Sequence, residues 1–413
     1  MKGDTREIGE DYRDTNGIAK YDDVPVYKGL VGVFVDESLI SFIDGVNGQL
    51  FYRGYAVEEL AEKSSFEEVA YLLIYGELPT KFQLEDFKEK LIQERNIPDN
   101  ILRILQSFPR NTTRIELLRT AISALSLYDP DDYDYTEEAN IRKGIRIIAK
   151  MPTLIAFAHR IQTNQPIVEP SYELSHAGNY YYMMTGEVPP DYFTNAFDKV
   201  LICHADHSIN SSTFSCRVTV STLSDLYSGI TSAIGTLRGP LHGGANEAVM
   251  RGFTYEVKRN DNVVIWAQKK LAKKEKIMGF GHRVYKTWDP RAIIMRGLAK
   301  KFYEAYKKGE RRDKITETGH NHQHDDFIFE MTEILTEFMI EKKGIYPNVD
   351  LYSAGLLHSL GIPMELYTPL FAASRSVGWV AHAIEQLKDN KLIRPRLKYI
   401  GKLGKIYIDL SER

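Results

Sequence analysis

The segment from Ser212 to Leu237 reads STFSCRVTVSTLSDLYSGITSAIGTL, and it is the stretch that decides the fold class. It is poor in charged residues and rich in Ser, Thr, Ala and Gly, a composition that lets helix backbones approach one another closely. A helix without a charged face is usually buried. The segment therefore predicts a central buried helix or helix pair, whose simplest role is that of a scaffold.

Amphipathic helical patterns recur on both sides of this segment. Ser65 is followed three residues later by Glu68, the spacing of a capping box, and apolar residues then recur at helical spacing until Gly76. Apolar residues between 327 and 339 trace one face of another helix, which should end at Gly344. These patterns indicate a mainly α-helical protein.

The clearest strand pattern is ISFIDGVNGQLFY at residues 40–52. Asp-Gly and Asn-Gly lie there between apolar and aromatic residues, which predicts a short β hairpin near the amino terminus. No regular alternation of strands and helices follows. We therefore expect a mainly α, multi-helical fold with this one hairpin, and not a doubly wound sheet.

Composition excludes several classes of function. The 413-residue chain has a formal net charge of −3, so no overall field would draw it to nucleic acid or to an anionic membrane. No run of 18 apolar residues occurs, and residues 1–23 are too charged for a signal peptide, so we expect a cytoplasmic protein with no membrane partner. Cys203 and Cys216 both lie in apolar segments and are expected to be buried thiols.

Chemistry is indicated first by GPLHGGANEAVM at residues 239–250. His242 lies there between glycine-rich turns at the start of an expected helix, whose positive end disfavours a protonated imidazole. A neutral histidine can donate a hydrogen bond to a carbonyl that is becoming an enolate. The alternative is that His242 only caps the turn.

A second histidine repeats the pattern in MGFGHRVYKTWDPR at residues 278–291. His282 follows a Gly-x-Gly turn, but the third glycine and the strand of a dinucleotide site are missing. Five lysines lie just upstream, namely Lys269, Lys270, Lys273, Lys274 and Lys276. The simplest interpretation of these lysines is a solvated helix face. Backbone amides and cations at one glycine turn can also hold a phosphate-bearing ligand.

An acid completes the candidate chemistry in YPNVDLYSAG at residues 346–355. Asp350 follows a turn and precedes an expected helix, so it could serve as the N-cap of that helix. A carboxylate beside neutral histidines could instead take a proton from carbon.

The segment 307–326 is charged, rich in histidine and without apolar periodicity, which predicts a solvated loop between two helices. His320, His322 and His324 could ligate a metal, which would make the chain a non-catalytic metal-binding protein. Simple exposure is the alternative that we favour, because the spacing alternates and no cysteine is near.

The motifs GPLHGGAN, GFGHRVYKTWDPR and PNVD followed by FAASRSVGW resemble the three signature regions of citrate synthases. The resemblance extends over nearly the whole chain, and includes HADHSINSSTFSCRV. Two segments depart from the family pattern, since residues 1–22 look like an extension and residues 307–326 look longer than usual.

The resemblance implies a role for each matching residue. The catalytic residues of the family fall on His242, His282 and Asp350. Its oxaloacetate-binding residues fall on His207, Arg291, Arg375 and Arg394. Its coenzyme A-binding residues fall on Glu275, Lys276, Ile277, Met278, Gly279 and Lys286.

The resemblance further implies a citrate synthase that condenses acetyl-CoA with oxaloacetate, with acetyl-CoA as a cosubstrate and with no metal or permanently bound cofactor. It implies a large helical domain from residues 1–242 and 354–413, and a small domain from residues 243–353 that closes over the substrate. It also implies a homodimer in which Arg394 reaches the active site of the partner subunit.

Two other enzymes remain as alternatives. A 2-methylcitrate synthase would share the mechanism and use propionyl-CoA, since one methylene changes selectivity by only ~1–3 kcal/mol in an apolar pocket. An α/β-hydrolase is suggested by the His-Gly-Gly of residues 242–244, but its Gly-x-Ser-x-Gly elbow would have to be LYSAG at residues 351–355, where leucine replaces the first glycine.

Overall fold

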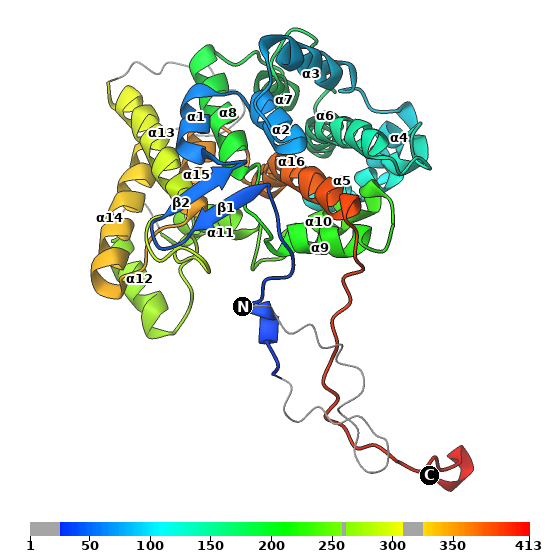
Figure 1. Cartoon of the computed structure of the whole chain (residues 1–413). Coiled ribbons are helices and arrows are strands. Elements are labelled where there is room, and N and C mark those ends of the chain that lie inside the picture. Colours follow the sequence, from blue (N-terminus) through cyan, green and yellow to red (C-terminus); the bar gives the residue numbers. More distant parts are fainter. Residues whose placement is uncertain (1–24, 258–261, 309–324) are drawn as a thin grey trace. The chain divides into compact units, whose positions relative to one another are not determined.

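A computed structural model describes residues 25–257, 262–308 and 325–413, and these form two compact units. The larger unit runs from Ser38 to Ile393 and contains every long helix of the described chain (Figure 1). The smaller unit joins the segment ending at Glu37 to residues 394–413, and its described part has only short 3₁₀ turns at Lys28–Leu30 and Leu410–Glu412.

Helices dominate the larger unit, as the sequence predicts. The α-helices are α1 (Val57–Lys63), α2 (Phe66–Tyr75), α3 (Lys81–Gln93), α4 (Asp99–Ser107), α5 (Arg114–Leu125), α6 (Glu137–Gln162), α7 (His176–Thr185), α8 (Asp191–His204), α9 (Ser211–Val220), α10 (Leu226–Leu237), α11 (Ala245–Arg251), α12 (Val263–Ala272), α13 (Pro290–Lys307), α14 (Asp325–Lys343), α15 (Val349–Ser359) and α16 (Tyr367–Lys388). Short 3₁₀ turns at Ser126–Tyr128 and Met364–Leu366 and a π-helical turn at Gly252–Glu256 complete them.

The predicted helix boundaries follow from their caps. Ser65 accepts the backbone amide of Glu68 at the start of α2, and Gly76 ends that helix in the left-handed region with φ 96°. The helix predicted around residues 327–339 is α14, and it ends before Gly344, whose φ is 62°. Both predictions are confirmed.

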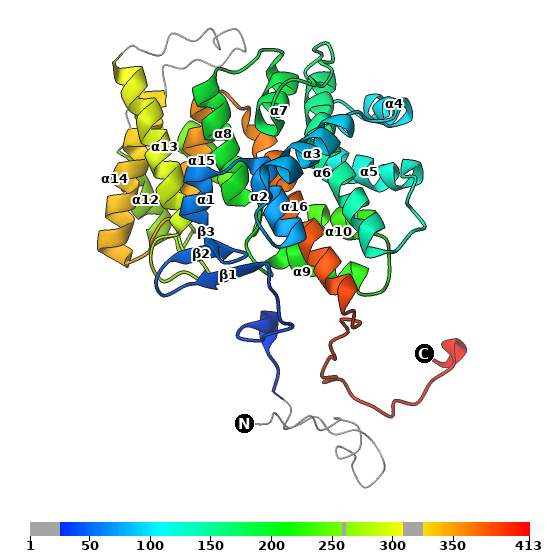
Figure 2. The same ribbon diagram turned by 45° about the horizontal axis from the view of Figure 1, so that its top comes forward.

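The amino-terminal hairpin is also confirmed. Strands β1 (Ser41–Asp44) and β2 (Gln49–Tyr52) pair antiparallel, and a two-residue strand β3 (Tyr55–Ala56) adds to β2. Figure 2 shows this small sheet beside α1, which packs against β2 and β3.

The predicted central helix pair consists of α9 and α10, which pack closely against each other. Gly229 makes this close packing possible, because a Cβ at that position would lie 2.7 Å from the Val220 side chain and 3.1 Å from the sulfur of Cys216. Both cysteines are buried and free, as expected.

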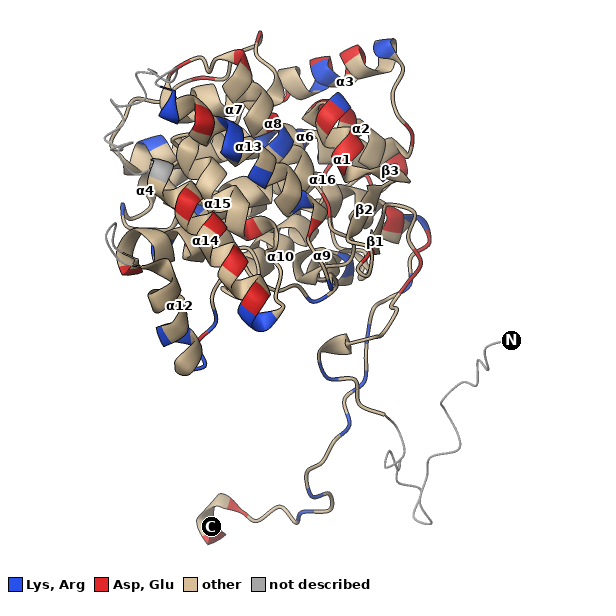
Figure 3. Ribbon diagram, turned by 90° about the vertical axis from the view of Figure 1, so that its left-hand side faces the viewer, with Lys and Arg blue, Asp and Glu red and all other residues tan. Residues whose placement is uncertain are grey.

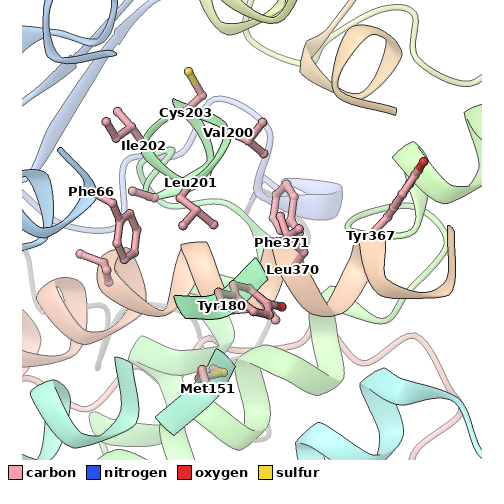
Figure 4. Packing of buried hydrophobic residues seen from close by; sticks show 14 of the residues in the cluster. Phe66, Met151, Tyr180, Val200, Leu201, Ile202, Cys203, Tyr367, Leu370 and Phe371 are labelled. Atoms are coloured by element: carbon pink, nitrogen blue, oxygen red, sulfur yellow. The ribbon is translucent and has the colours of Figure 1, made fainter. Parts of the chain in front are cut away.

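Helix α16 lies at the centre of the larger unit and is almost entirely buried. It packs against α6, α8, α9 and α10, and Figure 4 shows Leu370 and Phe371 of α16 near Val200 and Leu201 of α8. Because α8 leads into His207 and α16 carries Arg375, this contact brings two predicted substrate-binding residues together.

The surface of the described chain carries charges of both signs. Figure 3 shows Lys and Arg interspersed with Asp and Glu along the helices of one side. Among the described residues, no helix is long and apolar enough to cross a membrane. Both observations agree with the composition.

Candidate active site

His242 lies in the turn before α11 and its ring contacts a serine from a distant helix. Its Nε2 is 2.8 Å from Oγ of Ser212, at the start of α9. The Ser212 hydroxyl also lies 2.8 Å from Oδ1 of Asn210 and accepts a hydrogen bond of 3.1 Å from Nε1 of Trp379. Its single hydrogen can therefore go to Asn210 or to His242.

The other hydrogen bonds of Asn210 bear on the choice between these two acceptors. Its Oδ1 already accepts the backbone amides of Ser212 and Thr213, each at 3.1 Å, so the Ser212 hydroxyl at 2.8 Å would be a third donor to this oxygen. We therefore assign the Ser212 hydrogen to Nε2 of His242, which leaves the hydrogen of the neutral ring on Nδ1.

The charge state of His242 agrees with the prediction, but the physical cause is different. Burial and, to a smaller extent, the positive charge of Arg375 together lower the pKa of His242 to about 4. The sequence suggested the end of the following helix as the cause. Burial and a cation from α16 account for the neutral ring instead.

His282 is fixed by its own loop. Its Nδ1 accepts hydrogen bonds from the backbone amides of Val284, at 3.0 Å, and Tyr285, at 3.2 Å. The hydrogen of the neutral ring must then be on Nε2, where it can be donated. Burial lowers the pKa of His282 to about 4, and the charge of Arg291 adds to this effect.

His207 and His282 come together although 75 positions separate them in the sequence. Their ring centroids lie 5.0 Å apart at an interplanar angle of 76°. Tyr285 lies against both rings, and its hydroxyl is 3.2 Å from Nε2 of His207. Burial lowers the pKa of His207 well below its ordinary value, and the charge of Arg291 again adds to the effect.

Asp350 lies in the first turn of α15, but it is not the N-cap. Asn348 occupies that position, and its Oδ1 accepts the backbone amide of Asp350 at 3.0 Å. The interpretation of Asp350 as the N-cap is therefore wrong, because the cap lies two residues earlier. The Asp350 carboxyl does not cap the helix and can serve another role. Burial raises the pKa of this carboxyl to about 7 against the opposing charges of Arg291 and Arg375.

Arg291 and Arg375 are both buried and differ in their partners. Asp289 holds Arg291 with two hydrogen bonds, of 3.0 Å to Nε and 2.7 Å to Nη2, which raises the pKa of Arg291 although burial opposes this. Arg375 instead donates from Nε to the carbonyl of His204 at 2.7 Å, and no carboxylate of the described residues forms an ion pair with it. Burial lowers the pKa of Arg375 to about 10. A dianion would supply this missing charge.

Arg394 is exposed and belongs to the smaller unit. Its role in binding oxaloacetate stays a prediction.

Three of the six predicted coenzyme A residues line a cavity of about 210 Å³. Lys276, Ile277 and Met278 line it, together with Trp266 and Lys270 of α12. Glu275 lies 3.6 Å from Lys270 in an ion pair, and Gly279 has a φ of 85° where the chain turns toward His282. Lys286 is exposed on the His282 loop, where its cation is accessible to solvent.

Sequence reasoning missed Ser212 and Tyr285 as parts of the site. Ser212 begins the stretch that was interpreted as scaffold, and nothing in its local pattern shows that His242 will contact it. Tyr285 follows His282 by three residues, a spacing that could have indicated a shared turn.

The structure bears on two alternative interpretations, an α/β-hydrolase and a metal-binding protein. Residues 351–355, which an α/β-hydrolase would need as a sharp strand-to-helix turn, lie inside α15, so that interpretation is wrong. His320, His322 and His324 lie outside the described residues. Within the part of the chain that is described, no group of three or more His, Cys, Asp or Glu residues could hold a metal ion.

Comparison with known proteins gives a consistent result. The family model for the citrate synthase C-terminal domain matches residues 29–396. The chain is 44% identical over 390 residues to a citrate synthase of Haloferax volcanii, covering 94% of this chain and 98% of the relative. It is 42% identical to a citrate synthase of Synechocystis sp., covering 95% of each chain.

Solved structures agree. The crystal structure of citrate synthase from Thermotoga maritima is similar with a TM-score of 0.82 and 42% identity, covering 94% of this chain and 99% of that one. A ternary complex of the Thermoplasma acidophilum citrate synthase with carboxymethyl coenzyme A and oxaloacetate has a TM-score of 0.86 at 35% identity, covering 94% of this chain and 100% of that one.

Proposed function

The chain belongs to the citrate synthase family, and we propose that His242, His282 and Asp350 carry out its condensation of acetyl-CoA with oxaloacetate. The observation that carries this assignment is the environment of the three side chains, which shifts the pKa of each. Desolvation lowers the pKa of both His242 and His282 to about 4, which keeps the rings neutral, and raises the pKa of the Asp350 carboxyl to about 7. A base with a pKa near the working pH is suited to proton transfer.

Asp350 would take a proton from the methyl carbon of acetyl-CoA. At the same time, Nδ1–H of His242 would donate a hydrogen bond to the thioester oxygen, so that an enol forms without a free carbanion. Ser212 supports this step, because with its hydrogen assigned to Nε2 of His242 the ring would carry its own hydrogen on Nδ1.

His282 would act on the second substrate. Its Nε2–H would donate to the keto oxygen of oxaloacetate, which makes the keto carbon electrophilic, and the enol carbon would bond to that carbon. His207, Arg291 and Arg375 would hold the dianion. Hydrolysis of the resulting citryl thioester then releases citrate and coenzyme A.

Coenzyme A would bind as a cosubstrate along residues 275–279, with Lys286 as the phosphate-contacting cation. The cavity lined by Lys276, Ile277 and Met278 supports this placement. We expect no permanently bound cofactor. The packing of α11, α13 and α14 against α15 supports the proposed small domain of residues 243–353, whose closure would keep water from the enol.

A homodimer with a shared active site is the proposed assembly. Support comes from residues 394–413, which expose several large apolar side chains, among them Leu397, Ile400, Ile406 and Leu410. Arg394 would then complete the oxaloacetate site of the partner subunit. A cytoplasmic location fits the two free, buried cysteines.

The use of propionyl-CoA is not favoured. The relatives at 42–44% identity are citrate synthases, whereas one described as a citrate/2-methylcitrate synthase, from Bacillus subtilis, is 40% identical. Comparison of kcat/KM for acetyl-CoA and propionyl-CoA tests this choice, and a strong preference for propionyl-CoA would reverse it.

The proposed chemistry is tested by the release of free thiol from acetyl-CoA, measured with and without oxaloacetate. We expect release only with both substrates. The Asp350→Asn variant should fold and still bind oxaloacetate but lose this activity, because an amide cannot accept the methyl proton. Asp99→Asn is the matched control, since Asp99 also lies in the first turn of a helix but is exposed. Near-normal kcat in Asp350→Asn would remove Asp350 from the role of base.

A further inference from the structure

The β1–β2 hairpin contacts the chain on both sides of His207. At its base, Ser41 pairs with Tyr52 across the two strands. The Ser41 hydroxyl donates to Oδ2 of Asp206 at 2.6 Å and accepts the backbone amide of Ser208 at 3.0 Å. The residues immediately before and after His207 are therefore both bound to Ser41.

Tyr52, the cross-strand partner of Ser41, contacts the same segment around His207 from within the core. Tyr52 is fully buried, and its hydroxyl donates to the carbonyl of Asp206 at 2.9 Å and lies 3.3 Å from the amide of the same residue. Asp206 also lies 3.3 Å from Nε2 of His382, a buried residue of α16. The base of the hairpin thus fixes the backbone that carries His207.

The tip of the same hairpin contacts the His282 loop. The Gly45 carbonyl accepts the amide of Lys286 at 2.8 Å. A Cβ on Gly45 would lie 2.4 Å from the carbonyl oxygen of Val284, and one on Gly48 would lie 2.7 Å from that of Trp288. The two backbones therefore pack too closely for any side chain at either glycine.

The tip is held in shape by its own hydrogen bonds. The Asp44 carboxylate accepts the backbone amides of Val46, at 3.0 Å, and Asn47, at 2.9 Å, and also the side-chain amide of Asn47 at 2.7 Å. Gly48 adopts a φ of 68°, which closes the turn. The tip is therefore a preformed surface against which the loop can pack.

Three consecutive amides of the loop connect the hairpin to the His282 ring. Those of Val284 and Tyr285 donate to Nδ1 of His282, and that of Lys286 donates to Gly45. A shift of the hairpin tip would therefore move Lys286, which directly follows the two residues whose amides orient the His282 ring.

We propose that the β1–β2 hairpin is a positioning element that sets the separation of the His207 and His282 loops, and thereby aims Nε2–H of His282 at the keto oxygen of oxaloacetate. The two rings, 5.0 Å apart, lie on loops that meet the opposite ends of one hairpin. The inference rests on the proposed function, because it assigns a consequence to the placement of His282. The hairpin touches no substrate in this role.

The test is Gly45→Ala in the full-length protein. Its methyl group must displace the carbonyl of Val284, and we expect kcat to fall roughly 10- to 100-fold, as for a displacement of about 1 Å in an active site. The infrared stretch of the keto group of bound oxaloacetate should move back toward its value in solution, because a misaimed His282 polarises the carbonyl less.

Gly297→Ala is the matched control. Gly297 lies in α13, just after the same loop, and a Cβ there meets nothing within 4 Å. This variant should keep the kcat and the keto stretch of the unmodified protein. A folded Gly45→Ala variant that does the same would overturn the proposal.

Asp44→Ala covers the case in which Gly45→Ala does not fold. It adds no atoms and removes the hydrogen bonds that shape the tip, so we expect a smaller loss of kcat with the same shift of the keto stretch. A folded Asp44→Ala variant with unchanged kcat and keto stretch would count against the hairpin. If the unmodified protein itself releases no thiol from acetyl-CoA in the presence of oxaloacetate, the proposed function fails, and the role of the hairpin with it.

Discussion

His242 and His282 both lie in glycine-rich turns, but different kinds of contact fix their rings. The ring of His282 accepts two amides from residues two and three positions further along the chain. The ring of His242 is held by Ser212, 30 positions earlier in the sequence. One histidine is thus oriented locally and the other by tertiary packing.

With the hydrogens assigned as above, the two neutral imidazoles are opposite tautomers. Backbone amides occupy Nδ1 of His282, whereas a hydroxyl occupies Nε2 of His242. Burial lowers the pKa of each ring to about 4, so both are neutral donors at pH 7. The turns are similar in composition, and their partners set the direction in which each ring donates.

Removal of each ring should give the largest effects and should separate the two roles. We expect His242→Ala and His282→Ala each to lower kcat by about 100- to 1000-fold, the cost of losing one donor to a developing oxyanion. His282→Ala should also weaken oxaloacetate binding, because its loop loses the acceptor of two amides. His242→Ala should leave that affinity unchanged, as measured by calorimetry. Equal affinities in the two variants would contradict the division of roles.

The next effect in size is expected for Ser212→Ala, which removes the tertiary contact alone. Without the hydroxyl, nothing keeps the hydrogen of His242 on Nδ1, and we expect kcat to fall roughly 10- to 100-fold with little change in oxaloacetate binding. Steady-state kinetics measures this. Ser232→Ala in α10 is the control, because its hydroxyl makes only a 3.5 Å contact with a backbone carbonyl. Loss of activity in both variants would indicate a general packing defect.

The smallest expected effect is the change in kcat/KM that one pH unit produces. In its proposed role as a base Asp350 must be ionised, and its pKa is raised to about 7, so kcat/KM should rise with pH through that value and fall about tenfold per pH unit below it. The pKa values of the two histidines, about 4, add no further change between pH 5 and 8. A profile that is flat between pH 5 and 8 would contradict the raised pKa of Asp350.

Much of the fold follows from local patterns. The capping serine and terminal glycine of α2, the apolar face of α14 and the Asp-Gly and Asn-Gly pairs of the hairpin all specify elements within a few residues of themselves. The two glycine turns were recognised for the same reason. The N-cap of α15 was misplaced because Asn348 and Asp350 are both good caps, and their order in the turn is decided by backbone geometry.

The sequence by itself determined the helices, the hairpin, the signature turns and, through them, the family. Only the tertiary structure decided that Ser212 reaches His242, that the hairpin spans the loops of His207 and His282, and that burial raises the pKa of Asp350. The physical reason is range. Caps, turns and periodicity act over a few residues, whereas desolvation and hydrogen bonds between distant segments exist only after the chain has packed.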